Sequence, residues 1–110
     1  MAEKRRLVSI YLNEGDEWEG RPLYLEILHF LNRSGCTGGT VLRGLAGFTA
    51  GAGVTTTSLV DVGNKLPVVV QFIDRPEKVA EVLPTLQRMA GKRLIIAEEV
   101  EVVSPPSEDS

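Results

Sequence analysis

The stretch Leu66-Pro67-Val68-Val69-Val70-Gln71-Phe72-Ile73 has the β-branched and aromatic composition of a strand and is apolar at nearly every position. Successive side chains of a strand point to opposite faces. Each face therefore receives three apolar side chains, Val68, Val70 and Phe72 on one and Pro67, Val69 and Ile73 on the other. A strand with one face in water would alternate apolar and polar residues more cleanly. The pattern predicts a sheet whose two faces are both covered.

Two other segments carry apolar residues at helical spacing. The first follows Pro22, which suits the first turn of a helix, and ends at Ser34-Gly35. The second runs from Asp74 to Gly91 and begins with a capping pattern, because Glu77 follows three positions after its first residue. Pro84 should kink or interrupt this second helix, since it removes a hydrogen bond and clashes with the preceding turn. The apolar stripes are Leu23, Ile27, Phe30 and Leu31, and Val79, Val82, Leu83, Leu86 and Met89.

With further strands over Leu7–Leu12, Gly38–Arg43 and Leu94–Val103, the order of elements is βαββαβ. This order predicts an α+β, ferredoxin-like fold in which two helices cover one face of a four-stranded antiparallel sheet. The strand Leu7–Leu12 also has two apolar faces, and so short a chain leaves no third layer, so other subunits should cover the second face. We expect a single domain over residues 1–103 and a disordered acidic tail over residues 104–110.

A long glycine-rich loop separates the second and third predicted strands. Its first part is Gly44-Leu45-Ala46-Gly47-Phe48-Thr49-Ala50-Gly51-Ala52-Gly53, and Asp61 is the single charge from Gly44 to Asn64. Loops of this length are usually functional or disordered, and glycine lets a backbone approach a ligand closely. A flexible hairpin loop without a ligand is the alternative. We expect the segment Thr49–Thr57 to be mobile without ligand, because it has little to bury against the entropy of ordering.

Composition excludes several functional classes. The formal net charge of −3 argues against nucleic-acid binding, which needs a basic surface. A single cysteine, Cys36, excludes an internal disulfide framework and a cysteine-rich zinc site. No apolar run approaches the roughly 20 residues of a membrane span, and no secretory signal opens the chain, which predicts a cytoplasmic protein without direct membrane insertion.

The sequence offers no combination of residues that is typical of a catalytic site, and we predict neither a catalytic nor a metal-binding residue. His29 is the only histidine and shares its predicted helix face with Glu26 and Arg33, which indicates a solvated surface position. Cys36 has no histidine near it in sequence and is expected to be a small buried hydrophobe, with a reactive thiol as the alternative. The acidic residues Glu14, Asp16, Glu17 and Glu19 form a cluster that indicates a solvated face. Binding of a hard cation by this cluster is the alternative.

The sequence supports phosphate binding better than catalysis or metal binding. Arg43 precedes the glycine loop, Gly91-Lys92-Arg93 forms a second turn of glycine and basic residues, and Arg21 stands at the start of the first helix. Basic side chains from separate loops can converge on one anion. Taken singly, each of them is better explained as an ordinary solvent-exposed cation.

Several of these segments resemble a known family. Gly38-Gly39-Thr40-Val41, Gly47-Phe48 and Leu66-Pro67-Val68-Val69-Val70 are similar to the strand, loop root and following strand of the PII signal-transduction proteins. Asp16-Glu17-Trp18-Glu19-Gly20-Arg21-Pro22-Leu23-Tyr24 and Arg43-Gly44-Leu45-Ala46-Gly47-Phe48 resemble more closely an uncharacterised PII-like family, formerly a domain of unknown function. The resemblance extends from about residue 7 to residue 103.

The resemblance implies a homotrimer with its sheets facing inward and an adenine nucleotide, AMP or ADP, in the clefts between subunits. It implies no obligatory cofactor and no enzymatic activity, and it implies regulation of a partner such as a membrane transporter or an enzyme through the loop. Together with the basic residues above, the predicted nucleotide-binding positions are Arg21, Arg43, Gly44, Gly47, Phe48, Thr49, Gly91, Lys92 and Arg93.

The chain also departs from the PII pattern. Thr49 stands where PII proteins have the second glycine of their Gly-Phe-Gly, and the loop lacks the tyrosine that PII-style uridylylation modifies. The turn at Gly91 is shorter than the turn of the PII proteins, so we expect weaker phosphate binding. A monophosphate or another small ligand is then an alternative to a nucleotide with more phosphates. A small trimeric enzyme or metal-handling protein on the same scaffold is the alternative function.

Overall fold

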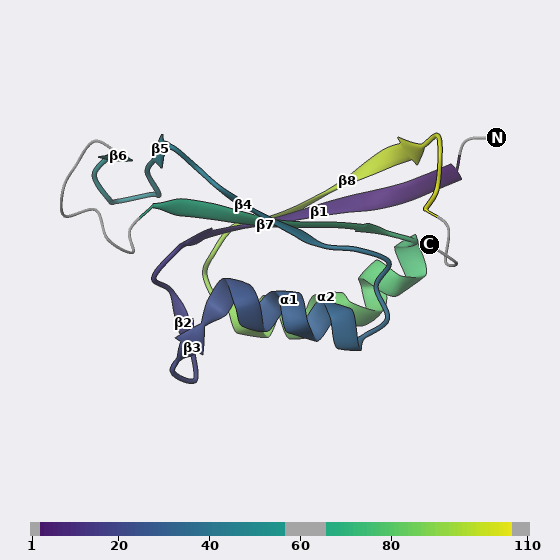
Figure 1. The fold of residues 1–110 in the computed structure, drawn as a ribbon, viewed down its shortest axis with the longest axis horizontal. Helices are drawn as coiled ribbons and strands as arrows, with labels where there is room; N and C mark the ends of the chain where they lie inside the picture. Colours follow the sequence, from purple (N-terminus) through teal and green to yellow (C-terminus); the bar gives the residue numbers. More distant parts are fainter. Residues whose placement is uncertain (1–2, 57–65, 107–110) are drawn as a thin grey trace.

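The computed structural model describes residues 3–56 and 66–106. A four-stranded antiparallel sheet packs against two helices that lie side by side on one of its faces (Figure 1). The sheet has the spatial order β4-β7-β1-β8 and consists of β1 (Glu3–Asn13), β4 (Thr40–Arg43), β7 (Pro67–Asp74) and β8 (Ile95–Val102). The helices are α1 (Leu23–Arg33) and α2 (Pro76–Ala90). The predicted ferredoxin-like fold is confirmed.

The core lies between the sheet and the helices. Val8 stands at its centre, opposite Phe72 of β7 on one side and Ala97 of β8 on the other. The side chains predicted for one face of β7 are all buried. Most of the predicted apolar stripes of the two helices are buried as well, at Leu23, Ile27, Leu31, Val79, Val82, Leu86 and Met89. Phe30 and Leu83, which the stripes also included, are half-buried. Full burial of one such side chain contributes roughly 1.5–3 kcal/mol. None of the described helices is long and apolar enough to cross a membrane.

The opposite, outer face of the sheet carries a row of apolar side chains, as the strand patterns predict, beside a polar row of Thr40, Gln71 and Ser9. Leu42, Val69 and Tyr11 stand in one row across β4, β7 and β1, because Val69 is in register with both of the others. Leu42 is 52% exposed and Tyr11 is 37% exposed. No helix covers this face within the described chain (Figure 1). It remains available to another molecule.

The helix ends differ from the sequence-based expectation. Pro22 is the residue before α1 rather than part of its first turn, because Arg21–Pro22 (β3) pairs with Glu17–Trp18 (β2) in a small hairpin. The predicted capping pair at α2 is wrong: Arg75 precedes the helix and no side chain caps it. Asp74 instead accepts a hydrogen bond from the Thr37 N–H at 3.0 Å and ties the segment before β4 to the end of β7.

Of the two predicted effects of Pro84, a kink or an interruption, the interruption is wrong, because α2 continues through Pro84 to Ala90. Pro84 and Ala80, whose carbonyl loses its donor, are not fully buried, so water can bind that carbonyl. Gly35 and Gly91 follow the two helices with φ of +82° and +60°, as expected for terminating glycines.

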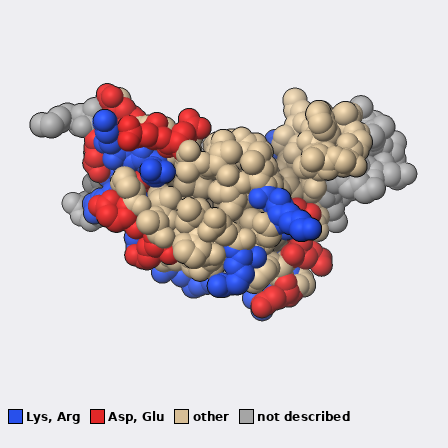
Figure 2. Space-filling view, turned by 180° about the vertical axis from the view of Figure 1, so that it is seen from behind, with Lys and Arg blue, Asp and Glu red and all other residues tan. Residues whose placement is uncertain are grey.

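The long loop begins as a second small hairpin that the sequence did not predict. Ala46–Gly47 (β5) pairs with Thr55–Thr56 (β6), and the Thr55 hydroxyl donates to the Gly47 carbonyl at 3.3 Å. The hairpin forms a protrusion without charged side chains beside the grey residues in Figure 2. The last residue of the segment expected to be mobile, Thr57, lies outside the described residues, and so does the end of the predicted tail, residues 107–110.

Candidate functional site

Three chain segments that the sequence singled out meet at one end of the sheet, on the left of Figure 1. Asn13, at the end of β1, is in register with Pro67. The Gly44 N–H donates to the Pro67 carbonyl at 2.7 Å, which holds the start of the long loop there. The Leu94 carbonyl accepts from the Tyr11 N–H at 3.0 Å, so the turn before β8 reaches the same end.

A cleft of about 390 Å³ opens at this end between the turn after β1 and the loop hairpin. Two of the predicted nucleotide-binding residues, Phe48 and Thr49, line it. Phe48 is 72% exposed, so its ring is free to contact a ligand. The remaining lining residues are Asn13, Gly15, Asp16, Ala52, Gly53 and Thr55.

Arg93 reaches the wall of this cleft through Asp16. The Arg93 Nε donates to Asp16 Oδ2 at 2.8 Å, and Arg93 Nη1 donates to the Ala90 carbonyl at 3.1 Å. The same Asp16 oxygen accepts from the Asn13 N–H at 2.9 Å. Both side chains are partly buried, at 35% exposure for Arg93 and 20% for Asp16. A guanidinium predicted to hold phosphate is therefore already held by a carboxylate.

Arg43 is held in a similar way. Its Nη2 lies 3.3 Å from Oε1 of Glu14, in the turn that lines the cleft. That Glu14 oxygen is buried and has no hydrogen-bond partner in the described part of the chain, so Arg43 stabilises it by charge rather than by an aligned hydrogen bond. The expectation that Glu14 and Asp16 belong to a solvated face is therefore wrong, since both side chains are at most one-quarter exposed. Glu17 and Glu19 are more open to solvent, as expected.

The other predicted basic residues are placed differently. Arg21 lies in β3 and pairs with Glu26 at 3.5 Å, and it does not line the cleft. Lys92 is exposed in the turn beside Arg93 and makes no ion pair within residues 3–56 and 66–106. Lys92 therefore keeps its charge uncompensated by the described residues.

Gly44 and Gly47 have a packing role that their sequence pattern did not indicate. A Cβ on Gly44 would lie 2.8 Å from Pro67 Cγ, and one on Gly47 would lie 3.0 Å from the same atom. Only glycine fits such a close approach without displacing the proline. The two glycines thus pack the root of the loop against β7.

Neither His29 nor Cys36 lines the cleft. His29 is on the solvent side of α1. Cys36 is half-buried, and burial raises the pKa of its thiol. Within the described ranges, no three His, Cys, Asp or Glu side chains gather closely enough to hold a metal ion.

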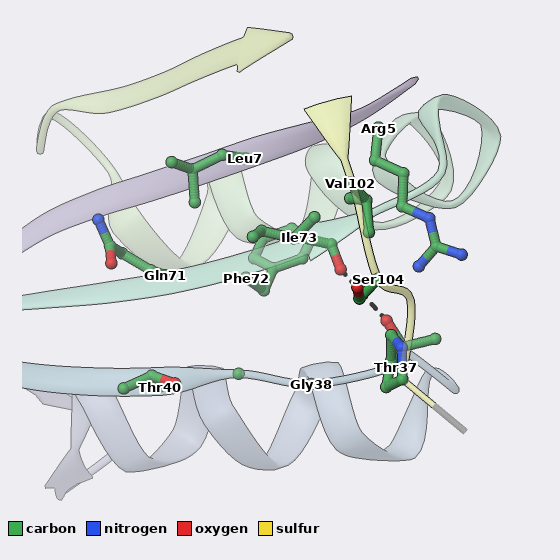
Figure 3. Close-up of a pocket in the computed structure, with 12 residues that line it drawn as sticks. Arg5, Leu7, Thr37, Gly38, Thr40, Gln71, Phe72, Ile73, Val102 and Ser104 are labelled. Carbon is green, nitrogen blue, oxygen red and sulfur yellow. Dashed lines mark hydrogen bonds between the residues drawn. The ribbon is translucent and has the colours of Figure 1, made fainter. Parts of the chain in front are cut away.

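A second cavity of about 400 Å³ lies on the outer face at the other end of the sheet (Figure 3). Leu7, Gln71 and Ile73 line it, together with Arg5, whose side chain is 8% exposed and pairs with Glu3 at 3.0 Å. The Thr37 hydroxyl donates to the Ile73 carbonyl at 3.2 Å beside it. The cavity belongs to the face that the sequence predicts to be covered by other subunits.

Solved structures define the class of the fold. CPII from Thiomonas intermedia K12, a nitrogen regulatory PII-like protein, matches in a form bound to ADP, AMP and bicarbonate, with a TM-score of 0.70 and 18% identity over 96% of this chain and 93% of that one. Its form bound to ADP and bicarbonate matches with a TM-score of 0.66 and 21% identity, over 96% and 94%. A putative PII-like signaling protein from Thermus thermophilus gives 0.65 and 21%, over 93% and 92%. The chain has a PII-like fold.

Sequence relatives define the family. The profile of the family DUF190, described as "Uncharacterized ACR, COG1993", matches residues 5–102. The UPF0166 protein of Aquifex aeolicus is 34% identical over 102 residues, which is 91% of this chain and 94% of the relative. The UPF0166 protein MJ1524 of Methanocaldococcus jannaschii is 36% identical over 83 residues, 76% of each. The chain therefore belongs to the DUF190 (UPF0166) family, and the predicted PII-like resemblance is confirmed.

Proposed function

We propose that this protein is a non-enzymatic PII-like signalling protein that binds an adenine nucleotide, AMP or ADP, at the root of its long loop. The observation that carries the proposal is the cleft in which Phe48 and Thr49 face a turn that binds Arg93. The CPII structures, named as bound to ADP and AMP, support the same class of ligand.

The cleft and the basic residues of the neighbouring segments each suit one part of such a ligand. The exposed ring of Phe48 can stack on an adenine, an interaction worth roughly 1–3 kcal/mol per base. Lys92 and Arg93 supply the charge for a phosphate, and a hydrogen bond to a charged group contributes roughly 1.5–3 kcal/mol. Arg43, at the start of the loop, adds a third cation at the same end of the sheet.

The protein acts as a homotrimer in this proposal. The row Leu42, Val69 and Tyr11 supports it, because an apolar sheet face of this kind is normally covered. A neighbouring copy then closes the nucleotide cleft at the subunit interface. Residues 1–103 act as one domain in the cytoplasm, and nucleotide binding changes the order of the loop, which contacts a transporter or an enzyme.

Calorimetric titration of the native protein with AMP, ADP and ATP tests the nucleotide proposal. We expect saturable binding of at least AMP or ADP, with one site per chain. A native protein that binds none of the three at millimolar concentration would overturn the proposal. Limited proteolysis with and without nucleotide then tests the loop, because an ordered loop is cleaved more slowly.

A further inference from the structure

Two carboxylates lie beside the basic residues that are predicted to bind a phosphate. Asp16 lies in the cleft wall and holds the Nε of Arg93 at 2.8 Å, while Glu14 lies 3.3 Å from Arg43. Of the three cations at this end of the described chain, two are therefore compensated by carboxylates of the same turn, and Lys92 is not. Among the residues that line the cleft, Asp16 alone is charged, so a phosphate that enters the cleft meets a carboxylate that is paired with Arg93.

Asp16 is held firmly in this position. Its Oδ2 accepts a hydrogen bond from the Asn13 N–H at 2.9 Å, and its backbone carbonyl accepts one from the Leu23 N–H at 2.8 Å at the start of α1. Moving the carboxylate away from an approaching ligand would break its hydrogen bond to the Asn13 N–H and its ion pair with Arg93. Any phosphate bound by Arg93 must share the guanidinium with Asp16 and lie close to its negative charge.

We propose that Asp16, through its ion pair with Arg93, sets the charge of the ligand that the cleft accepts and favours a nucleoside monophosphate over the di- and triphosphates. This inference rests on the proposed nucleotide function. Each additional phosphate adds a negative charge next to a fixed carboxylate, in a partly buried site where screening by water is incomplete. Asp16 is thus a specificity-determining residue rather than one that contributes affinity.

The variant Asp16→Asn separates charge from structure. Its amide oxygen can still accept the hydrogen bonds from Asn13 and Arg93, while the negative charge is removed. In calorimetry without divalent cations, we expect Asp16→Asn to bind all three nucleotides more tightly. The preference for AMP over ADP should fall by about tenfold, since one unit charge at about 6 Å contributes this order in a partly exposed site. The preference for ADP over ATP should fall in the same direction.

Glu99→Gln is the matched control. It removes one negative charge from an exposed pair with Lys4 on the β1–β8 side of the sheet, so the ratios among the three affinities should not change. An equal change in all three affinities on Asp16→Asn, or a loss of binding, would assign Asp16 a structural role and overturn the inference while the nucleotide function stands. If neither the native protein nor the variant binds a nucleotide, the proposed function fails and the inference fails with it.

A second variant covers the case in which Asp16→Asn does not fold. Arg93→Gln leaves the Asp16 carboxylate without its cation. This variant must shift the ratios of the three nucleotide affinities in the opposite direction, because the binding of ADP and ATP is weakened more than the binding of AMP. A uniform loss for all three ligands would show that charge discrimination does not arise from this pair.

Discussion

Gly44 packs against Pro67 so closely that a methyl group at its Cα would lie 2.8 Å from the proline Cγ. Its backbone N–H also donates to the Pro67 carbonyl at 2.7 Å. These two contacts join the start of the loop to the first residue of β7. The start of the loop is therefore fixed to the sheet at Gly44. A ligand that changes the order of the loop would act on the residues after Gly44.

Gly44→Ala should destabilise the fold by about 1–3 kcal/mol, because the added methyl group must displace the Pro67 ring or the backbone of β7. Urea denaturation followed by circular dichroism measures the change. Gly53→Ala is the control from the same loop, since its Cβ would meet no atom within 4 Å. It should change stability by less than about 0.5 kcal/mol. Equal effects of the two substitutions would contradict the packing role of Gly44.

Asp74→Ala should cost about 1–3 kcal/mol of stability. The Asp74 side chain is buried and accepts hydrogen bonds from the N–H groups of Thr37 and Arg75, and the substitution leaves both donors without this acceptor. Thermal unfolding checks the result. Glu77→Ala removes the residue that the sequence pattern paired with Asp74 as a cap, and it should have little effect because no side chain caps α2. A larger loss for Glu77→Ala would restore the capping interpretation.

Val69→Asp should dissociate the proposed trimer into folded monomers. Val69 is half-buried in the single chain, so an aspartate there reaches water in a monomer, whereas a covered face would bury an unpaired charge at a cost of several kcal/mol. Light scattering gives the mass of the native protein and the variant. Val54→Asp, on the exposed hairpin, makes the same chemical change away from the sheet and should leave the assembly intact. A native protein that scatters as a stable monomer excludes the trimer.

Combined substitution of Lys92→Ala and Arg93→Ala should weaken nucleotide binding by about two orders of magnitude or more. Two charged contacts are lost together, and the Asp16 carboxylate is left uncompensated in the cleft wall. Calorimetry with AMP and ADP measures the effect, and light scattering checks that the assembly is unchanged. Lys4→Ala, which removes an exposed cation at the start of β1, is the control. Undiminished binding by the double variant would place the site elsewhere.

Alkylation of Cys36 should be slower in the folded protein than in urea at pH 8, because burial raises the pKa of the folded thiol and lowers the fraction of reactive thiolate. The raised pKa also has a consequence for stability. The contribution of Cys36 to the free energy of unfolding is fully present below the pKa of the unfolded thiol, about 8.5. This contribution is lost as the pH rises through the higher pKa of the folded thiol. Cys36→Ser should remove this alkaline component of the unfolding profile. Equal alkylation rates in both states would contradict the prediction.

The candidate site was predicted only in part. Phe48 and Thr49 line the cleft and Arg93 adjoins it, as the loop composition and the family resemblance suggested. Asp16 was missed because a run of acidic residues normally indicates a solvated surface. The available signal was its place in the Asp16–Tyr24 motif, which the family resemblance had already marked.

The sequence by itself determined the class of fold, because the periods of two and 3.6 residues that define strands and helices are local properties. The two apolar faces of β7 and the terminating glycines 35 and 91 were likewise visible in short windows of sequence. What only the tertiary structure decided are contacts between distant segments: Arg93 is 77 residues from Asp16, and Asp74 is 37 residues from Thr37. Such pairs depend on strand register and on how the turns pack, and no local pattern of charge specifies which carboxylate a given guanidinium meets.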